Sequence, residues 1–194
     1  MTVEDAVVGN GGESPATEQS TERIAPEVCV RPANGNDLAA VLDVGHRTWP
    51  STFGPITGPD YVEMGLAKWW TADAVIPAIR SGRTFVAEVG GHVVAMAVHG
   101  LHEDEQVLWK LYVLPEWQGG GVGRRLLEAV VDRARELGHT RLAVPVVDGN
   151  DRAMHFYERH GFRQTGREAG GSGMPDTIWL AADLAPGTSE EEDA

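Results

Sequence analysis

The stretch LYVLPEWQGGGVGRRLLEAV, residues 111–130, decides the fold of this chain. It begins as an apolar run typical of a strand, breaks at Pro115, and passes through four glycines in five positions into a helical pattern. The first turn of a helix leaves backbone N–H groups unpaired, and glycines let a phosphate approach them closely. Arg124 and Arg125 add full positive charges at the same place. The segment therefore predicts an anion site, and we expect the anion to be a pyrophosphate.

Two other phosphate-binding patterns do not fit the spacing of these glycines. The P-loop sequence Gly-x-x-x-x-Gly-Lys-[Ser/Thr] does not occur in the chain. The dinucleotide pattern Gly-x-Gly-x-x-Gly fails because Arg124 stands at the third glycine position after Gly119 and Gly121. A dinucleotide-dependent oxidoreductase is therefore disfavoured, and it stays only as a hypothesis that NAD(P)H binding would test.

Strand and helix patterns alternate on both sides of this stretch. A hairpin is expected at 83–101, and a helix at 34–50 that Pro50 ends. A polar-aromatic stretch follows at 50–62. The other expected elements are strands at 27–33, 106–114, 140–147, 162–168 and 176–184, one or two helices within 61–82, and helices at 123–138 and 150–161. This order predicts an α/β fold with a mixed, mostly antiparallel sheet of about six to seven strands and helices on both faces. The strands at 106–114 and 140–147 should run parallel.

Composition places the chain among globular proteins of ordinary size. Its 194 residues are 42% hydrophobic and 23% charged, which is enough for one domain with a core. No apolar run approaches the roughly 18–20 residues that span a bilayer, and the acidic N-terminus lacks a signal-peptide pattern. Cys29 is the single cysteine, so no intramolecular disulfide can form. We expect a cytoplasmic protein with no membrane partner.

The net charge of −13 is concentrated at the ends of the chain. Of the 29 acidic residues, five lie within 1–22 and four within 188–194, and neither segment contains a Lys or Arg. Both ends are poor in bulky apolar residues, so we expect disordered acidic tails at 1–25 and 186–194 flanking one domain at 26–185. Because nucleic-acid binding needs a basic surface, we expect no nucleic-acid partner.

Two motifs together resemble the GCN5-related N-acetyltransferase (GNAT) family. Gln118-Gly119-Gly120-Gly121-Val122-Gly123 is similar to the family's coenzyme A loop, Gln/Arg-x-x-Gly-x-Gly/Ala. NDRAMHFYERHGF, residues 150–162, resembles its Asn-x-x-Ala-x-x-x-Tyr-x-x-x-Gly-Phe segment. The expected element order matches the family fold from about residue 27 to 184. The resemblance implies a GNAT-like acyl-CoA N-acyltransferase fold, with acetyl-CoA as co-substrate.

The resemblance also implies roles for individual residues. Backbone amides of the glycine loop would hold the pyrophosphate, and the main chain around Leu111 and Val113 would pair with the pantetheine arm. Asn150 would bind that arm, and Tyr157 would stand near the sulfur. The implied cofactor-binding residues are Leu111, Tyr112, Val113, Gln118, Gly119, Gly120, Gly121, Val122, Gly123, Arg124, Arg125, Asn150, Ala153 and Tyr157. Simpler structural roles compete with three of these: a helix cap for Asn150, a packing residue for Tyr157 and a solvated helix residue for Arg125.

The implied reaction is direct attack of a neutral amine on the acetyl carbonyl. A main-chain N–H of the strand before the loop would stabilise the oxyanion, and Tyr157, with an ordinary pKa near 10, would protonate the leaving thiolate as general acid. Pro145 fits a family feature as well, because a strand proline lacks a ladder donor where relatives separate two strands to admit the cofactor.

One departure from the family concerns the general base. Many relatives carry a Glu four residues before the position of Leu111, where this chain has Val107. Glu105 is our candidate for the base and His99 the next, while the segment HEDE at 102–105 equally suits a polar loop. The missing Glu motivates an alternative hypothesis, a non-catalytic acyl-CoA-binding sensor module.

The identity of the acceptor stays open at this stage. The acceptor would be a small-molecule or peptide amine, and an antibiotic, a polyamine, an amino acid and a protein N-terminus are all compatible with the sequence. The region 46–72 would line its pocket by family resemblance. The sequence shows no metal-ligand cluster and does not decide whether the protein is a homodimer.

Overall fold

The structure, a computed structural model, describes residues 27–171 and 174–184. The predicted tails, and residues 26 and 185 of the predicted domain, lie outside these ranges. The strands are β1 Val28–Pro32, β2 Thr84–Val89, β3 His92–His102, β4 Glu105–Val113, β5 Arg141–Val147, β6 Arg163–Glu168 and β7 Thr177–Asp183. The helices are α1 Leu38–Thr57, α2 Pro59–Trp69, α3 Ala72–Arg80, α4 Val122–Glu136 and α5 Asp151–Arg159, with short 3-10 turns η1 at Gly35–Asp37 and η2 at Pro115–Trp117.

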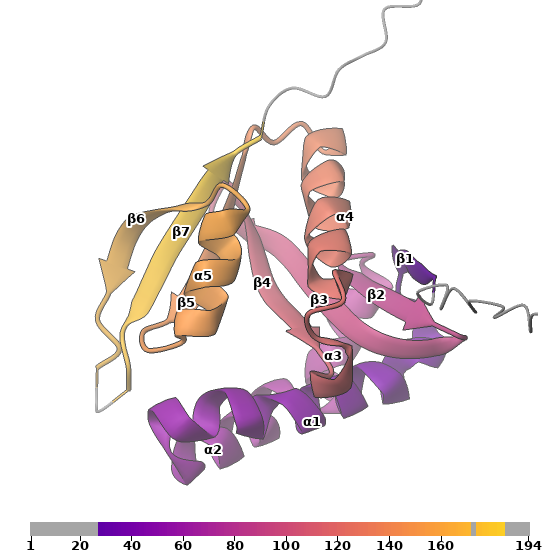
Figure 1. Cartoon of the computed structure of the whole chain (residues 1–194), viewed down its shortest axis with the longest axis horizontal. Helices are drawn as coiled ribbons and strands as arrows, with labels where there is room; N and C mark the ends of the chain where they lie inside the picture. The colour runs from indigo at the N-terminus through magenta and orange to yellow at the C-terminus, as the bar shows by residue number, and fades with distance from the viewer. Residues whose placement is uncertain (1–26, 172–173, 185–194) are drawn as a thin grey trace, which may run out of the picture.

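The strands form one seven-stranded sheet in the order β1-β2-β3-β4-β5-β7-β6 (Figure 1). Every neighbouring pair is antiparallel except β4 and β5, which run parallel as the strand-helix-strand link predicts. The predicted mixed, mostly antiparallel sheet is therefore confirmed. No helix among the described residues is long and apolar enough to cross a bilayer.

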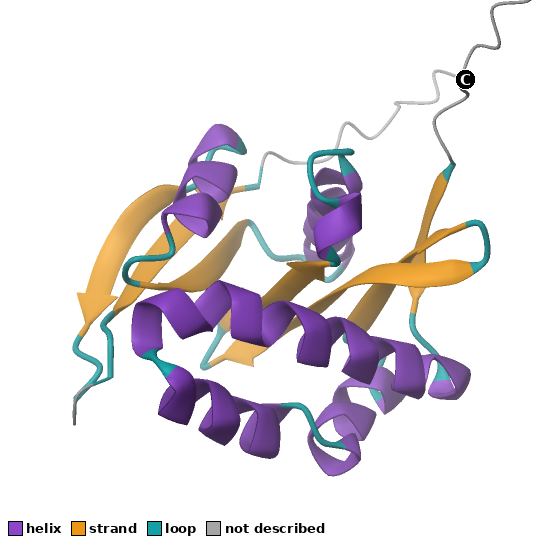
Figure 2. Ribbon diagram, turned by 60° about the horizontal axis from the view of Figure 1, so that its bottom comes forward, coloured by secondary structure: helices purple, strands orange, loops and turns teal. Residues whose placement is uncertain are grey.

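Alternation along the strands builds an apolar core on each face of the sheet. In β2, Phe85 and Ala87 pack with Leu126 and Val130 of α4, whereas Val86 between them packs with α1 and α3. Tyr157 of α5 belongs to the α4 side. Figure 2 shows α1 and α2 lying alongside each other across the sheet. Helices thus cover both faces, as predicted.

The first helix is longer than its sequence pattern predicts. We expected Pro50 to end it, but α1 continues through Pro50 and Pro55 to Gly58, where φ is 79°. A proline inside a helix costs about 3 kcal/mol because it removes a hydrogen bond and crowds the preceding turn. Trp49 and Phe53, on either side of Pro50, are each only 5% exposed, and burying two such rings contributes about 1.5–3 kcal/mol each. Tertiary packing therefore outweighs the local signal.

Two tryptophans pack reciprocally on two glycines to join α1 to α2. The ring of Trp70, just past α2, lies against Gly45 of α1, and the ring of Trp49 of α1 lies against Gly65 of α2. A Cβ built at either glycine would overlap the facing indole. The close approach of these helices therefore requires glycine at both positions.

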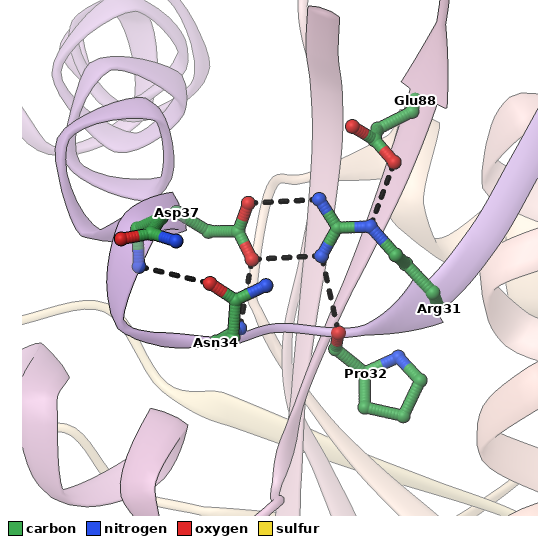
Figure 3. Close-up of polar contacts among 6 residues, drawn as sticks. Arg31, Pro32, Asn34, Asp37 and Glu88 are labelled. Atoms are coloured by element: carbon green, nitrogen blue, oxygen red, sulfur yellow. Dashed lines mark hydrogen bonds and ion pairs between the residues drawn. The ribbon is translucent and has the colours of Figure 1, made fainter. Parts of the chain in front are cut away.

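An ion-pair network fixes the beginning of the domain (Figure 3). The guanidinium of Arg31 contacts Asp37 at 2.8 Å and Glu88 at 2.7 Å, which ties β1 to η1 and to β2. Asp37 also accepts from the backbone N–H of Asn34, completing a capping box for η1. The Arg31 guanidinium holds the pKa of the buried Asp37 carboxyl below its usual value.

The sheet opens where β4 and β5 separate. Only Gln106 with Leu142 and Val107 with Ala143 pair between these strands. Pro145, two residues further along β5, cannot donate to a ladder. On the other side of β4 the register shifts, because His99 pairs with Leu108 and Val98 with Lys110, so that Trp109 is left without a partner. The main chain beyond Leu108 is therefore available to a ligand inserted between the strands.

Candidate active site

A cleft of about 400 Å³ lies beside the end of β4 that β5 leaves unpaired, and the glycine loop, α5 and α1 also line it. Eleven of the fourteen predicted cofactor-binding residues line it, namely Leu111, Tyr112, Val113, Gln118, Gly119, Gly121, Gly123, Arg124, Asn150, Ala153 and Tyr157. Gly120, Val122 and Arg125 do not. The two sequence motifs, separated along the chain, therefore meet at one site.

The glycine loop leads into α4 without a side-chain cap. Gly119 and Gly121 have φ near 82° and 81°, a left-handed conformation that L side chains rarely adopt, so the turn itself requires glycine there. Gly121 is the N-cap and makes no side-chain cap hydrogen bond, since glycine has no side chain to accept from the first-turn N–H groups. Such N–H groups, with the positive end of the helix macrodipole, are suited to an anion, and they lie next to the cleft. Val122 is buried beneath the turn, so only its backbone can take part.

The side chain of Gln118 stabilises the loop from below. Its Nε2 donates to the carbonyl oxygen of Val113 at 2.7 Å, joining the loop to the end of β4. Gly123 lies close to the opposite wall, since a Cβ there would stand 3.5 Å from Phe156 and 3.6 Å from Leu111. These contacts hold the loop in place, and the N–H of Gln118 already donates to the carbonyl oxygen of Pro115, so an anion would have to be met by the N–H groups that follow it.

Three guanidinium groups line the cleft, in a chain that is acidic as a whole. They belong to Arg124 at the start of α4 and to Arg152 and Arg159 of α5. Arg124 also pairs with Glu128 at 2.9 Å on the exposed helix surface. Arg125 points elsewhere, because its Nη1 donates to the carbonyl oxygen of Val28 in β1. The structure therefore favours the structural role for Arg125.

Helix α5 contributes more side chains to the cleft than its motif residues predicted. Arg152, Phe156 and Arg159 line the cleft at spacings of four and three residues, beside Ala153, Tyr157 and His160. That spacing places all six side chains on one side of the helix. The signal that could have identified this surface is the pair of arginines, seven residues apart, within the second motif at 150–162.

Asn150 and Tyr157 both line the cleft and also stabilise the fold around α5. The Oδ1 of Asn150 accepts from the N–H of Ala153 at 3.2 Å, so it caps α5 while also lining the cleft. Tyr157 is 6% exposed and packs between the rings of Phe156 and Phe162. Burial raises the pKa of Tyr157, so its phenol keeps its proton well above neutral pH.

Neither candidate base lies among the residues that line the cleft. Glu105 stands at the opposite end of β4, 3.1 Å from Arg141, in a separate hollow with His102 and Asp104. His99 is buried near Phe85, and its Nδ1 lies 2.6 Å from the Gln106 side chain. Burial, with help from two nearby arginines, lowers the pKa of His99. The geometry thus separates both groups from Tyr157.

The opposite side of the cleft is aromatic. Thr48 and Thr52 bring α1 to the cleft, and behind them six rings contact one another: Trp49, Phe53, Tyr61, Trp69, Trp70 and Tyr112. Lys110 of β4 is embedded in this α1–α2 aromatic cluster. Its Nζ donates to the Trp69 carbonyl oxygen at 3.1 Å and lies 4.3 Å from the centre of the Trp70 ring. Burial lowers the pKa of Lys110 to about 8.

Comparison with known proteins identifies a family for this arrangement. The model of the acetyltransferase (GNAT) family matches residues 46–162, which is more than half of the chain. Mycothiol acetyltransferase of Propionibacterium freudenreichii is 32% identical over 141 residues, which are 70% of this chain but only 43% of that protein. An uncharacterised N-acetyltransferase of Mycobacterium bovis is 31% identical over 139 residues, covering 69% of this chain and 85% of the relative.

Solved structures share the fold. PaiA N-acetyltransferase of Thermoplasma acidophilum, in complex with coenzyme A, superposes with a TM-score of 0.73 at 17% identity, over 81% of this chain and 99% of that one. The ribosomal-protein-S18-alanine N-acetyltransferase of Escherichia coli gives 0.61 at 22% identity, over 87% and 99%. The separated strands, the uncapped glycine loop and the family match agree with one another, and the chain belongs to the acetyltransferase (GNAT) family, which uses acetyl-CoA as co-substrate.

Proposed function

We propose that this chain transfers the acetyl group of acetyl-CoA to an amine by direct attack, with Tyr157 as general acid. The observation that carries the proposal is the meeting, in one cleft, of the uncapped start of α4, the part of β4 beyond Leu108 that has no partner on its β5 side, and the buried phenol of Tyr157. Any one of these features occurs in unrelated folds. Their combination would place an anion site, a strand edge and a proton donor one after another along one molecule of acetyl-CoA.

The phosphate groups of acetyl-CoA would lie at the glycine loop. Backbone N–H groups from Gly119 to Gly123 would bind the pyrophosphate, since the N–H of Gln118 is already donated to Pro115, and Arg124, Arg152 and Arg159 would neutralise charge around it. The fold itself does not require glycine at 120, where an added Cβ would meet only the Trp117 carbonyl oxygen at 3.7 Å. Close approach of a phosphate gives that position a physical reason.

The reactive end of acetyl-CoA would lie between β4 and β5. The pantetheine arm would take the main-chain positions that β5 leaves unpaired along Leu111 to Val113. An N–H from this segment would stabilise the oxyanion that forms when the amine attacks the carbonyl. The thiolate leaves as the carbon–sulfur bond breaks, and Tyr157 gives it a proton. Because burial raises the pKa of Tyr157, the phenol is protonated throughout the neutral range.

No carboxylate among the described residues lines the cleft, and this affects how the amine loses its proton. Glu105 and His99 lie elsewhere, so we do not retain them as bases. We propose that the acceptor enters as the neutral amine, or gives its proton to water, after which attack needs no protein base. The rate at subsaturating acceptor should then rise with pH toward the pKa of the acceptor itself.

The test is an assay of thiol release from acetyl-CoA over a panel of primary amines. Tyr157→Phe should lower kcat by about a hundredfold or more while the affinity for acetyl-CoA changes little. Tyr61→Phe, which removes a phenol from the aromatic cluster outside the cleft lining, is the matched control. Undiminished turnover in Tyr157→Phe would remove it from the acid role. Tight acetyl-CoA binding by calorimetry without turnover on any amine would instead support the sensor module, which no observation on the structure favours.

A further inference from the structure

Three rings meet on the sheet face opposite α4 and α5. Trp109 of β4 and Trp179 of β7 have ring centres 6.1 Å apart, although β5 lies between these strands. His102, at the end of β3, lies 5.7 Å from each of them. We call these three residues the aromatic ledge. Because the rings on the neighbouring strands β3 and β4 reach the ring on β7 across the intervening β5, the ledge covers the part of β5 around Pro145, which pairs with Trp179.

The ledge lies where β4 and β5 separate. Trp109 is the residue left without a partner by the register shift in β4, and it comes two residues after Val107, the last residue paired with β5. Leu111, two residues beyond Trp109 on β4, lines the cleft, whereas none of the three ring residues does, so the ledge adjoins the cleft through β4. An acetyl group held between the strands would therefore be approached across this aromatic surface.

The floor beneath the ledge is apolar, and no helix residue belongs to it. Trp179 packs on a small cluster of Val107, Ala143 and Ala181, and that cluster contains no helix residue. Trp109 keeps 37% of its surface exposed, which is unusual for a tryptophan within a strand. Val107 is fully buried in this cluster, so the floor of the ledge is apolar.

The geometry of the rings indicates the kind of group they would receive. His102 and Trp179 are nearly parallel, at 15°, while Trp109 stands at 89° and 79° to them, so both a ring face and a ring edge are presented. Charges around the ledge are mixed. Glu168 accepts from the indole N–H of Trp179 at 3.3 Å, whereas Arg83 lies near Trp109 beside Gly100. The rings, rather than net charge, therefore distinguish this surface.

We propose that the aromatic ledge is the specificity surface for the acceptor, and that the acceptor class is primary amines with an aromatic ring near the amino group. This inference rests on the proposed acetyltransferase function. The ring of the acceptor stacks on Trp109 and Trp179 while its amino group reaches the carbonyl between β4 and β5. Stacking replaces water on exposed apolar surface and adds the preferred geometry of aromatic pairs.

The experiment compares kcat/KM for 2-phenylethylamine and tryptamine with that for butylamine and 2-cyclohexylethylamine. The wild-type protein should prefer the aromatic amines by about tenfold or more. Trp109→Ala and Trp179→Ala should each remove most of that preference, whereas Trp109→Phe should keep it. The Kd for acetyl-CoA, measured by calorimetry, should stay within about twofold in all three variants, since they lie outside the phosphate-binding loop.

Leu101→Ala is the control, because Leu101 is 58% exposed on β3 next to His102, carries no ring, and points to the other face of the strand from its neighbour. It should leave the preference unchanged, and thermal melting should show each variant to be folded. Equal kcat/KM for aliphatic and aromatic amines in the wild-type protein would contradict the role of the ledge in acceptor specificity. It would not affect the proposed acetyltransferase function. Absence of turnover on every amine would overturn both proposals.

Discussion

The two sides of the cleft are built in different ways. The α4–α5 side consists of backbone groups and motif residues that lie within two short segments, 118–124 and 150–160. The side that faces α1 is lined by Thr48, Thr52 and Tyr112 and is backed by side chains from α1, α2 and β4, such as Trp49 and Lys110. Short segments of sequence can form a binding surface for a co-substrate that does not vary, whereas a surface for a particular acceptor depends on packing between distant segments.

The largest effect should come from changing the backbone of the cofactor side. Gly121→Val places a β-branched residue at φ 81° in the cap of α4 and should lower acetyl-CoA affinity by about a hundredfold or more. Gly91→Val is the matched control, since Gly91 has the same φ of 81° in the β2–β3 turn with open space around it. Calorimetry with acetyl-CoA distinguishes them. Equal losses of affinity in both variants would mean that backbone strain, and not the anion site, is being measured.

A smaller effect should come from the packing beneath the acceptor side. Gly45→Ala forces Trp70 away from α1 and should destabilise the protein by about 1–3 kcal/mol. Gly54→Ala, in the same helix with nothing within 4 Å, should instead be neutral or stabilising by up to about 1 kcal/mol. Urea unfolding measures both. In Gly45→Ala the acceptor KM should rise more than the acetyl-CoA Kd. A larger change on the cofactor side would show that the two sides are not built independently.

The smallest effect concerns the buried charge of Lys110. Burial lowers the pKa of Lys110 to about 8, below the value near 10.4 of an unfolded chain. Below pH 8 both states are protonated and the folded state carries the full cost of burying the charge. Between about pH 8 and 10 the unfolded chain binds more protons, so stability should rise with pH, by on the order of 1–2 kcal/mol.

Lys110→Met should flatten that rise, and Lys68→Met, at an exposed site on α2, should leave it unchanged. Urea unfolding between pH 7.5 and 10 measures the slope. An identical slope in Lys110→Met and the wild-type protein would contradict the assignment, and the rise would then have to come from other groups.

The sequence was most informative where structure follows from local rules. The glycine loop, the hairpin at Gly90 and the parallel pair β4–β5 could be predicted because each depends on neighbouring residues or on one short crossover. Eleven of fourteen predicted cofactor residues line one cleft for the same reason. Arg125 was not separable from Arg124 by sequence, since its partner, the Val28 carbonyl, lies 97 residues away.

Other expectations failed, or found no support, because distant contacts decide them. Pro50 lies inside α1 because Trp49 and Phe53 are buried on either side of it, which no local pattern reveals. Glu105 was chosen by proximity along β4, but the strand carries it away from the point of separation to Arg141. The aromatic ledge joins residues from three strands whose order in the sheet is not readable from the chain. These are long-range facts, and only the fold provides them.

The two-residue pairing of β4 with β5 has a mechanical consequence. The sheet therefore consists of a group of four strands, β1 to β4, and a group of three, β5, β7 and β6. Strand pairing joins the two groups only at Gln106 and Val107 of β4. A ligand bound between β4 and β5 would contact both groups of strands and hold them together. Amide protons of residues 108–113, 144, 146 and 147 would then become the most sensitive reporters of occupancy, and the empty and loaded proteins would differ in stiffness more than in shape.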